Sequence, residues 1–452
     1  MTRQVRIGVL GTGGRGAEAY GRWFVEHPEK CEVVAVADVI AHRRESFADQ
    51  ARVPAQNRFG DWSQLLREAN RLGLDGVVIA LPDKQHLEPT VRAAQLGLAI
   101  LLEKPLTPDE ATLSTLERKL KGLDSRIAVA HVLRETPFWK SVQRVTESGA
   151  IGDIATIRIE ENIGFWHFAH SYVRGNWRNT DESSPMVLAK TSHDLDIIRW
   201  IAGRPPTRVA SFGSLLHFHE GNAPEGAPTH CLKGCPVADT CPFYAPRYYA
   251  DALAGTDGWP VALLGPDTSR EGRMAALAEG PYGRCVYRAD NDVVDHQQTV
   301  FSFPDGQTAT LTTSAFTGSN TRTFQITGTR GELSGRMQSG ELRLETFSPD
   351  GVKWAAMVDL AGTATVRTAT NGPLQHNVYE WNAVPPHSES ADHRGHAGGD
   401  DALAEQFIEA VASGDFEEHV TTTLAASLDS HWMAFAAERA RKTGETQELK
   451  LA

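Results

Sequence analysis

Short apolar runs alternate with helix-like segments through the first third of the chain. The runs "VRIGVL", "CEVVAVA", "DGVVIA" and "LAILL" are almost continuously apolar, and segments with helical spacing, such as "QHLEPTVRAAQLG", separate them. Strands that are buried on both faces of a parallel sheet have this composition. The pattern therefore predicts an amino-terminal α/β domain with a doubly wound, Rossmann-type parallel sheet.

A glycine-rich turn follows the first apolar run. Gly11, Gly13 and Gly16 have the Gly-x-Gly-x-x-Gly spacing, and Asp38 ends the second run. Such glycines allow a tight turn and a close approach of pyrophosphate to the backbone, while an acid at the end of the second strand accepts the ribose hydroxyls. The arrangement predicts NAD binding. Arg43 and Arg44 keep NADP open, and a turn or helix cap is the alternative role of Asp38.

Two further polar segments come directly after apolar runs. Pro82 and His86 follow one run, and Glu103 and Lys104 follow the next, in "EKP". Ligands of parallel sheets bind beyond the carboxyl ends of the strands, so we expect all four residues beside the cofactor. Lys104 could orient or deprotonate a substrate hydroxyl, with Glu103 balancing its charge. An exposed loop lysine is the alternative.

The length and the net charge of the chain limit the number of domains and the kinds of partner to be expected. A chain of 452 residues exceeds what one core usually serves, so we expect a domain at 1–126 and a second at 127–452. The net charge of -12 argues against a nucleic-acid or anionic-membrane partner. The sequence has neither a leader-like start nor a run long enough to span a bilayer, which predicts a soluble cytoplasmic protein.

Four cysteines lie in or beside a segment rich in glycine and proline, an expected insert at about 221–285. They are Cys231, Cys235, Cys241 and Cys285. Four thiolates could hold a structural zinc ion or an iron–sulfur cluster, and reduced structural thiols are the alternative. A bound metal would staple the insert over a substrate cleft, because so long a loop needs support to stay ordered.

The segment "FAHSYVRGNWRN" concentrates aromatic, basic and amide side chains. Aromatic faces and planar donors suit sugars, and paired arginines suit an anionic group, although a surface loop with salt bridges is an alternative. The candidate substrate contacts, together with one histidine from "GHAGGD", are Tyr172, Arg174, Asn176, Trp177, Arg178 and His396.

The glycine turn, the Pro82 to His86 loop, "EKP" and "VAHVLRETPFWKSVQRVTESGAIGDI" together resemble the Gfo/Idh/MocA family of NAD(P)-dependent, mostly sugar-active oxidoreductases. The resemblance implies that Lys104 reaches both the cofactor ribose and the substrate. It also implies a second α/β domain with an open, mainly antiparallel sheet, whose faces carry the substrate site and often an oligomer contact. We therefore expect a small-molecule sugar or glycoside as substrate and a homo-oligomer.

Members of that family commonly carry an aspartate four residues before a histidine in the substrate domain. Here "MVLAKTSHDLDIIRW" has His193, but Ala189 occupies the aspartate position. Lys190 precedes His193 by three residues, and a helix would place both on one face. We expect Lys190 and His193 to be the acid/base pair. A structural histidine and a solvated lysine are the alternatives.

Two reactions are consistent with these groups. Both begin with hydride transfer from a pyranose carbon, expected at C3, to NAD. A dehydrogenase releases NADH, whereas a redox-neutral glycosidase returns the hydride after the aglycone has left. The insert, "VRGNWRN" and "KTSHDLD" look similar to the branch of NAD-dependent glycoside hydrolases that includes sulfoquinovosidases, and Arg174 and Arg178 would suit a sulfonate. The redox-neutral glycosidase is therefore favoured. A non-catalytic NAD-binding sensor is the alternative from another class.

Overall fold

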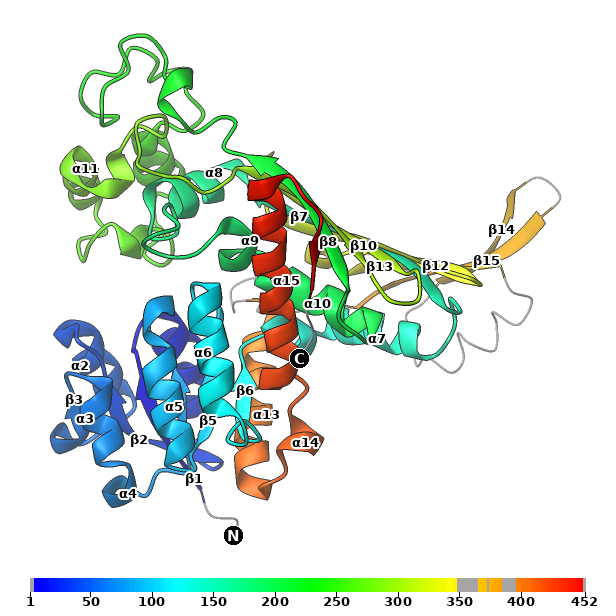
Figure 1. Ribbon diagram of the computed structural model, residues 1–452. Helices are drawn as coiled ribbons and strands as arrows, with labels where there is room; N and C mark the ends of the chain where they lie inside the picture. The colour runs from blue at the N-terminus through cyan, green and yellow to red at the C-terminus, as the bar shows by residue number, and fades with distance from the viewer. Residues whose placement is uncertain (1–3, 348–364, 372–373, 384–395, 450–452) are drawn as a thin grey trace.

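The computed structural model describes residues 4–347, 365–371, 374–383 and 396–449. Within them, one six-stranded and one ten-stranded sheet pack with helices into an α/β structure (Figure 1). The predicted fold class is confirmed. In these parts of the chain no helix is long and apolar enough to cross a membrane.

The first sheet is wholly parallel and has the strand order β3-β2-β1-β4-β5-β6. Its strands are β1 (Val5–Leu10), β2 (Cys31–Ala37), β3 (Arg58–Phe59), β4 (Gly76–Ile79), β5 (Ala99–Leu102) and β6 (Ile127–Val129). The apolar runs seen in the sequence are buried here, as the pattern predicted. Because β6 begins at Ile127, this sheet continues past the domain boundary expected at residue 126.

Helical segments lie between these strands. They are η1 (Gly14–Gly21), α1 (Arg22–Glu26), α2 (Ala41–Gln50), η2 (Ala55–Asn57), α3 (Trp62–Arg67), α4 (Ala69–Leu72), η3 (Asp83–Gln85), α5 (Leu87–Gln95) and α6 (Glu110–Leu120). Asp109 caps the start of α6 by accepting from the backbone N–H of Thr112. The carboxyl ends of β1, β4 and β5 thereby open onto the glycine turn, the Pro82 loop and Glu103-Lys104 at one edge of the sheet.

The second sheet has the order β14-β15-β13-β12-β11-β7-β10-β9-β8-β16, and only the β7 and β10 pair is parallel. Its strands are β7 (Ile154–Gly164), β8 (Arg208–Ser214), β9 (His296–Ser302), β10 (Thr308–Thr317), β11 (Thr321–Gly328), β12 (Gly331–Arg336), β13 (Glu341–Thr346), β14 (Thr365–Asn371), β15 (Leu374–Asn382) and β16 (Gln447–Glu448). This is the open, mainly antiparallel sheet that the family resemblance implied.

The helical segments of this second part begin with η4 (Val132–Glu135). The others are α7 (Pro137–Glu147), α8 (Phe165–Phe168), η5 (Ala169–Arg174), α9 (Met186–Ala189), α10 (Ser192–Ala202) and η10 (Met337–Ser339). Thr136 caps α7, Pro137 occupies its first turn, and Phe138 and Trp139 pack against Phe324 of β11. The helix that leaves the first domain is thus anchored on the second sheet.

An insert joins β8 to β9 and lies above the amino-terminal domain at the upper left of Figure 1. Its helical segments are η6 (Glu220–Asn222), η7 (Arg247–Ala252), η8 (Val261–Leu263), α11 (Arg270–Glu279) and η9 (Pro281–Gly283). Tyr249, Leu277 and Tyr282 form a small core of its own together with Cys231. The insert is therefore a folded unit rather than an extended loop.

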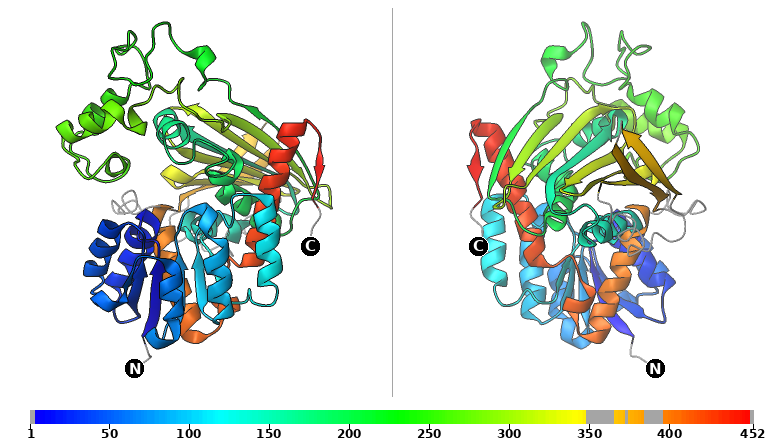
Figure 2. Two further views of the ribbon diagram at one scale, coloured as in Figure 1. Left: turned by 60° about the vertical axis from the view of Figure 1, so that its left-hand side comes forward. Right: turned by 90° about the vertical axis from the view of Figure 1, so that its right-hand side faces the viewer.

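The carboxy-terminal helices return to the first domain. They are η11 (His396–Gly398), α13 (Gly399–Ser413), α14 (Phe416–His419) and α15 (Leu424–Thr443). Leu403 and Phe407 of α13 share a core with Ile7 and Val9 of β1. In both views of Figure 2, α15 runs from the edge of the second sheet to α6 beside the first. The two sheets are thus held together by the end of the chain as well as by its middle.

Candidate active site

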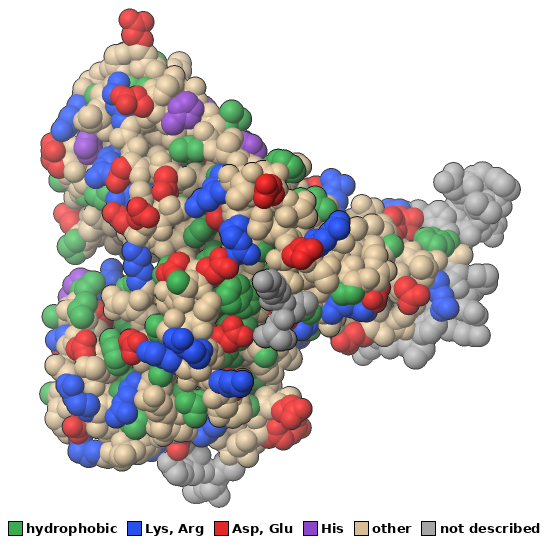
Figure 3. Space-filling model, in the orientation of Figure 1, with side chains coloured by type: hydrophobic (Ala, Val, Ile, Leu, Met, Phe, Trp, Pro, Cys, Tyr) green, Lys and Arg blue, Asp and Glu red, His purple; other side chains and the backbone are tan. Residues whose placement is uncertain are grey.

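Two cavities meet between the sheets, in the hollow region visible in Figure 3. The cavity on the side of the first sheet has a volume of about 480 Å³, and the cavity on the side of the second sheet about 550 Å³. Three residues line both: Lys104, Trp177 and His193. Both volumes fall in the range of small-molecule sites. A ligand of the first sheet and a ligand of the second would therefore meet at these three side chains.

The glycine turn has the shape that a dinucleotide requires. A Cβ on Gly16 would lie 1.9 Å from the carbonyl oxygen of Gly11, and a Cβ on Gly11 would lie 2.3 Å from that of Ala80. At Gly13 the same construction meets no atom nearer than 3.9 Å, so open space remains over the turn. The residues therefore fit a pyrophosphate that approaches the backbone at the start of η1.

Asp38 fixes this turn from the end of β2. Its Oδ2 accepts from the backbone N–H of Thr12 at 2.8 Å, and its Oδ1 accepts from that of Ile40 at 2.8 Å. The carboxylate therefore has the turn-forming role that was the alternative to ribose binding. Its position beside the glycine turn is compatible with both roles, and the ribose contact stays a prediction.

Glu103 interacts with several buried polar side chains and does not only balance the charge of Lys104. Its Oε1 accepts from Arg15 Nε at 2.6 Å and from the Tyr20 hydroxyl at 2.7 Å, and Arg15 also pairs with Asp400 of α13 at 2.7 Å. Burial would raise the pKa of Glu103, but the charges of Arg15 and Lys104 outweigh burial and lower it. Glu103 stays ionised and ties the "EKP" turn to η1 and α13.

Lys104 projects into the junction of the two cavities. Its Nζ donates to the carbonyl oxygen of Ala189 at 3.4 Å. Burial lowers the pKa of Lys104, opposed by the carboxylates of Glu103 and Asp83 and assisted by Lys190. A lysine with a lowered pKa exchanges protons more readily near neutral pH, so Lys104 has the environment of a general base.

Pro82 lines the cavity on the side of the first sheet, whereas His86 is 1% exposed. The two ring nitrogens of His86 lie 2.7 Å from the Pro105 carbonyl oxygen and 2.8 Å from that of Leu81. Both nitrogens thus face the protein's own backbone. His86 therefore lies outside the lining of this cavity, and it connects the two loops that follow β4 and β5.

A chain of charges lines the cavity on the side of the second sheet. Lys190 Nζ lies 3.0 Å from Glu161 Oε1, and Arg322 Nε lies 2.8 Å from Glu161 Oε2 and 2.9 Å from Asp194 Oδ1. Burial raises the pKa of Asp194 to about 6, opposed by Arg322 and reinforced by Glu161. Lys190 is therefore held by a buried carboxylate and is not a solvated surface lysine.

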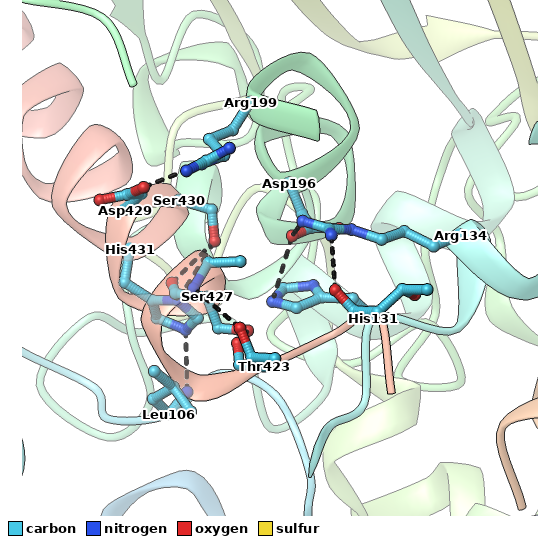
Figure 4. Close-up of polar contacts among 12 residues, drawn as sticks. Leu106, His131, Arg134, Asp196, Arg199, Thr423, Ser427, Asp429, Ser430 and His431 are labelled. Atoms are coloured by element: carbon cyan, nitrogen blue, oxygen red, sulfur yellow. Dashed lines mark hydrogen bonds and ion pairs between the residues drawn. The ribbon is translucent and has the colours of Figure 1, made fainter. Parts of the chain in front are cut away.

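The segment predicted as one helix around Lys190 is split in two. Lys190 follows the last residue of α9 as its C-cap, and His193 lies in the first turn of α10. Both side chains nevertheless line the same cavity. Asp196, three residues further on, lies outside it and forms a bidentate ion pair with Arg134, with both distances 2.6 Å (Figure 4).

Aromatic side chains form another wall of this cavity. Tyr172, His167 and Trp259 line it, and the rings of His167 and Trp259 lie 5.2 Å apart. Burial lowers the pKa of His167 to about 3, and its Nδ1 lies 3.0 Å from Asn320 Oδ1. Because Trp259 belongs to the insert, the insert reaches the cavity.

The remaining predicted substrate contacts separate into two groups. Asn176 and Trp177 line the cavities. Arg174 is 2% exposed and donates to the carbonyl oxygens of Arg284 and Phe243, and Arg178 pairs with Asp290 at 2.9 Å. Both arginines thus bind the insert, so their geometry does not support the predicted sulfonate contact.

His396 completes the set of predicted substrate contacts. It begins η11, but its side chain lies outside the described residues.

The four cysteines of the insert surround one small cavity of about 10 Å³. All are free thiols, and in the described ranges no three histidine, cysteine or acidic side chains are arranged to hold a metal ion. A space of this size takes about one water molecule, which is too small for an iron–sulfur cluster. Burial raises the pKa of Cys241 and of Cys285, as in inert packed thiols. This arrangement does not support the predicted metal site.

Several residues of the site were missed in the sequence, above all Glu161 and Arg322. One signal could have identified Glu161: Ile157, Ile159 and Ile163 alternate along β7 on its buried face, and Glu161 occupies the same face. A charged residue in an inward position of an alternating strand needs a partner. Arg322, on the neighbouring strand β11, is that partner.

Comparison with known proteins identifies the family. Residues 5–131 match the NAD-binding Rossmann fold of the GFO_IDH_MocA oxidoreductase family, and residues 145–423 match its carboxy-terminal alpha/beta domain. The chain therefore belongs to the Gfo/Idh/MocA oxidoreductase family, as the sequence motifs predicted.

Among curated relatives, inositol 2-dehydrogenase of Corynebacterium glutamicum is 29% identical over 213 residues, which are 47% of this chain and 57% of the relative. The scyllo-inositol 2-dehydrogenase (NAD(+)) of Bacillus subtilis is 25% identical over 217 residues, which are 48% of this chain and 59% of the relative. The matched stretches thus span little more than half of these relatives.

Solved structures extend the likeness over the whole fold. Levoglucosan dehydrogenase, in complex with NADH and levoglucosan, has a TM-score of 0.67 at 16% identity and covers 99% of this chain and 100% of its own. An oxidoreductase from Agrobacterium radiobacter, in complex with NAD+, L-tartaric acid and magnesium, has a TM-score of 0.65 at 18% identity and 99% coverage of both chains. At these identities the likeness concerns the fold alone.

Proposed function

We propose that this protein is an NAD-dependent dehydrogenase of a small polyol or sugar. The observation that carries the proposal is that Lys104 and His193 line both cavities. One cavity adjoins the sheet that bears the glycine turn, and the other holds polar and aromatic groups suited to hydroxyls and a C–H face. The names of the curated relatives, which are inositol dehydrogenases, support this substrate class.

The reaction needs a hydride acceptor and a proton acceptor. NAD would lie on the glycine turn, with its nicotinamide toward Lys104, and would accept the hydride from a carbinol carbon. Lys104 Nζ takes the hydroxyl proton, because burial lowers its pKa and so makes the neutral amine easier to form. His193 borders the same space and holds the reacting hydroxyl against Lys104.

Lys190 and Glu161 have a different part in this scheme from the one predicted for Lys190. The ion pair keeps Lys190 as an ammonium donor, which can bind a neighbouring hydroxyl of the substrate. Glu161 supplies the carboxylate that the chain lacks at Ala189. The proton therefore leaves through Lys104, while Lys190 orients the ring.

A direct test uses a panel of inositols, anhydro sugars and free pyranoses with NAD or NADP. We expect NADH to accumulate with one or a few members of the panel, and NADP to be a poor cofactor because Asp38 repels a 2′-phosphate. Absence of NADH formation with every member would contradict the proposal. NAD binding without any turnover would favour a sensor.

Redox-neutral glycoside hydrolysis is the second candidate. The cavity holds more proton-transfer groups than a dehydrogenase uses, namely Lys190, Glu161 and His167 besides Lys104. These groups could serve elimination of an aglycone. Release of an aryl aglycone that requires NAD but accumulates no NADH would support this candidate. A sulfoquinovoside has less support, because Arg174 and Arg178 bind the insert instead.

A homo-oligomer is part of the proposal. Phe212, Val300 and Phe316 lie on the neighbouring strands β8, β9 and β10 and are 68%, 46% and 44% exposed. Exposed apolar side chains on adjoining strands of an open sheet face favour a protein contact. Light scattering should give a multiple of the chain mass, and Phe212→Asp should reduce it. A monomeric wild-type protein would contradict this part.

A further inference from the structure

One peptide unit beside Lys104 is held at both ends by buried histidines. The carbonyl oxygen of Pro105 lies 2.7 Å from His86 Nδ1, and the N–H of Leu106 donates to His431 Nε2 at 2.8 Å. These two backbone groups belong to the same Pro105–Leu106 peptide. Figure 4 shows the contact of Leu106 with His431.

The hydrogen-bond partners define the role of each ring. A carbonyl oxygen only accepts, and both ring nitrogens of His86 face one, so the ring acts here as a hydrogen-bond donor: Nδ1 donates to Pro105 at 2.7 Å, and Nε2 lies 2.8 Å from the carbonyl oxygen of Leu81. His431 Nδ1 lies 2.7 Å from the Ser427 carbonyl oxygen and donates to it, which leaves Nε2 as the acceptor for Leu106. One histidine is thus a donor to the peptide and the other an acceptor from it.

The Pro105–Leu106 peptide lies where only side chains can supply its hydrogen-bond partners. Leu106 and His431 are fully buried, and the turn follows the end of β5, where neighbouring strands no longer supply backbone partners. A buried N–H or C=O without a hydrogen-bond partner destabilises the folded state. His86 comes from the loop that follows β4, and His431 comes from α15.

We propose that His86 and His431 are positioning residues that clamp the Pro105–Leu106 peptide and thereby hold Lys104 at the junction of the two cavities. The proposal rests on the proposed function, since it assigns the means by which Lys104 is placed. Lys104 lies one residue before the clamped unit, so a movement of that unit displaces its side chain. The clamp also makes α15, at the end of the chain, part of the support of the site.

Paired substitutions separate positioning from simple loss of packing. In His431→Gln the side-chain amide oxygen reaches the former position of Nε2, whereas His431→Asn reaches only that of Nδ1. At position 86 the order is reversed, because His86→Asn keeps a donor near Nδ1 and His86→Gln does not. Within each pair the two variants carry the same amide group and differ only in its reach. Gln should therefore replace the histidine at position 431, and Asn should replace it at position 86.

We expect His431→Gln and His86→Asn to keep kcat within about 3-fold of wild type, and His431→Asn and His86→Gln to lose about 10- to 100-fold, as expected for a misplacement on the order of 1 Å. KM for NAD should change less than kcat. Arg439→Gln is the control, because it removes the ion pair of α15 with Glu110 without touching the clamped peptide. The clamp would be overturned if the Gln and Asn variants at one position lost kcat equally. It would also be overturned if Arg439→Gln lost as much kcat as His431→Asn.

A second readout does not depend on turnover. The titration of Lys104 is followed by NMR of reductively ¹³C-methylated protein, with the resonance assigned by Lys104→Arg. In His431→Asn and His86→Gln the pKa of Lys104 should rise toward its ordinary value as the turn loosens into solvent. If this crossed pattern appears in a protein that oxidises no polyol, the clamp stands and the proposed function fails. An unchanged titration in all four variants overturns the clamp.

Discussion

At the scale of single residues, the site is defined by charges that burial forces into pairs. Glu161 is the clearest example, because its two oxygens hold Lys190 at 3.0 Å and Arg322 at 2.8 Å. An ionised carboxylate that is almost fully buried is tolerated only with such partners. Lys190 is therefore held in position by a carboxylate, which suits it to orient a substrate.

Replacement of Glu161 tests this role. Glu161→Gln should lower kcat/KM about 10- to 100-fold, because Lys190 loses its counter-charge and its position. The pKa of Asp194, about 6 from burial and from Glu161, should fall when Glu161 is neutral, so any acid limb that Asp194 sets should move to lower pH. pH profiles of kcat/KM measure both effects.

A matched control lies on the same strand. Glu160 precedes Glu161 on β7, is only partly buried and pairs with Arg158 at 2.8 Å on the other face. Glu160→Gln should leave the pH profile unchanged. If both variants behave alike, the cavity-facing position of Glu161 has no special role.

At the scale of elements, the insert contributes a wall of the cavity on the side of the second sheet. Trp259 is 48% exposed, and its ring lies 5.2 Å from that of His167 and 5.9 Å from that of Trp166. An aromatic face of this kind packs against the C–H face of a sugar or cyclitol ring. The insert thus supplies one wall of this cavity.

Removal of this face should weaken substrate binding selectively. Trp259→Ala should raise KM for the polyol about 3- to 10-fold, in line with aromatic contacts of about 0.5–1.5 kcal/mol, and leave KM for NAD unchanged. Leu263→Ala, at an exposed insert residue that does not line the cavity, is the control. A rise in KM for NAD in the Trp259 variant would contradict the assignment.

Sequence patterns predicted the elements of the first sheet better than the contacts of the site. The continuous apolar runs identified β1, β2, β4 and β5, because each strand is buried on both faces and needs only local information. The glycine turn and Lys104 followed from their places at strand ends. Pairings such as Glu161 with Arg322 join residues far apart in the chain, so local spacing could not reveal them.

The arginines and cysteines illustrate the same limit. Residue type alone suggested a sulfonate site at Arg174 and a metal at Cys231, but the side chain of Arg174 donates to the carbonyl oxygens of Arg284 and Phe243 and lies 3.8 Å from Cys231 Sγ. Composition indicated that these residues are special, but not which partners they have. The return of α13 to the first core was likewise not predicted, since its partners on β1 lie at the other end of the chain.

At the scale of the whole molecule, neutral histidines are buried where the two sheets are joined. Burial lowers the pKa of His131 to about 4, and that of His167 and His431 to about 3. In the unfolded chain each returns to about 6.5. Between these values only the unfolded state binds the proton, so the free energy of unfolding falls as pH drops below about 6.5.

This linkage predicts a measurable loss of stability in acid. Each such histidine should contribute a slope of about 1.4 kcal/mol per pH unit between pH ~6.5 and its folded pKa. Urea unfolding at a series of pH values should show this fall in the free energy of unfolding. His131→Leu should reduce the slope by about 1.4 kcal/mol per pH unit. His42→Leu, at an exposed histidine of α2, should leave the slope unchanged. Equal slopes in wild type and His131→Leu would contradict the linkage.

In the proposed reaction, a hydride passes from a polyol carbon to NAD beside Lys104. The most direct measurement uses a substrate with deuterium at the reacting carbon and follows that deuterium by mass spectrometry. We predict that it appears in released NADH and that Lys104→Met lowers its rate of transfer by about 100-fold or more. Turnover that leaves no deuterium in NADH, or full activity of the Lys104 variant, would contradict the account.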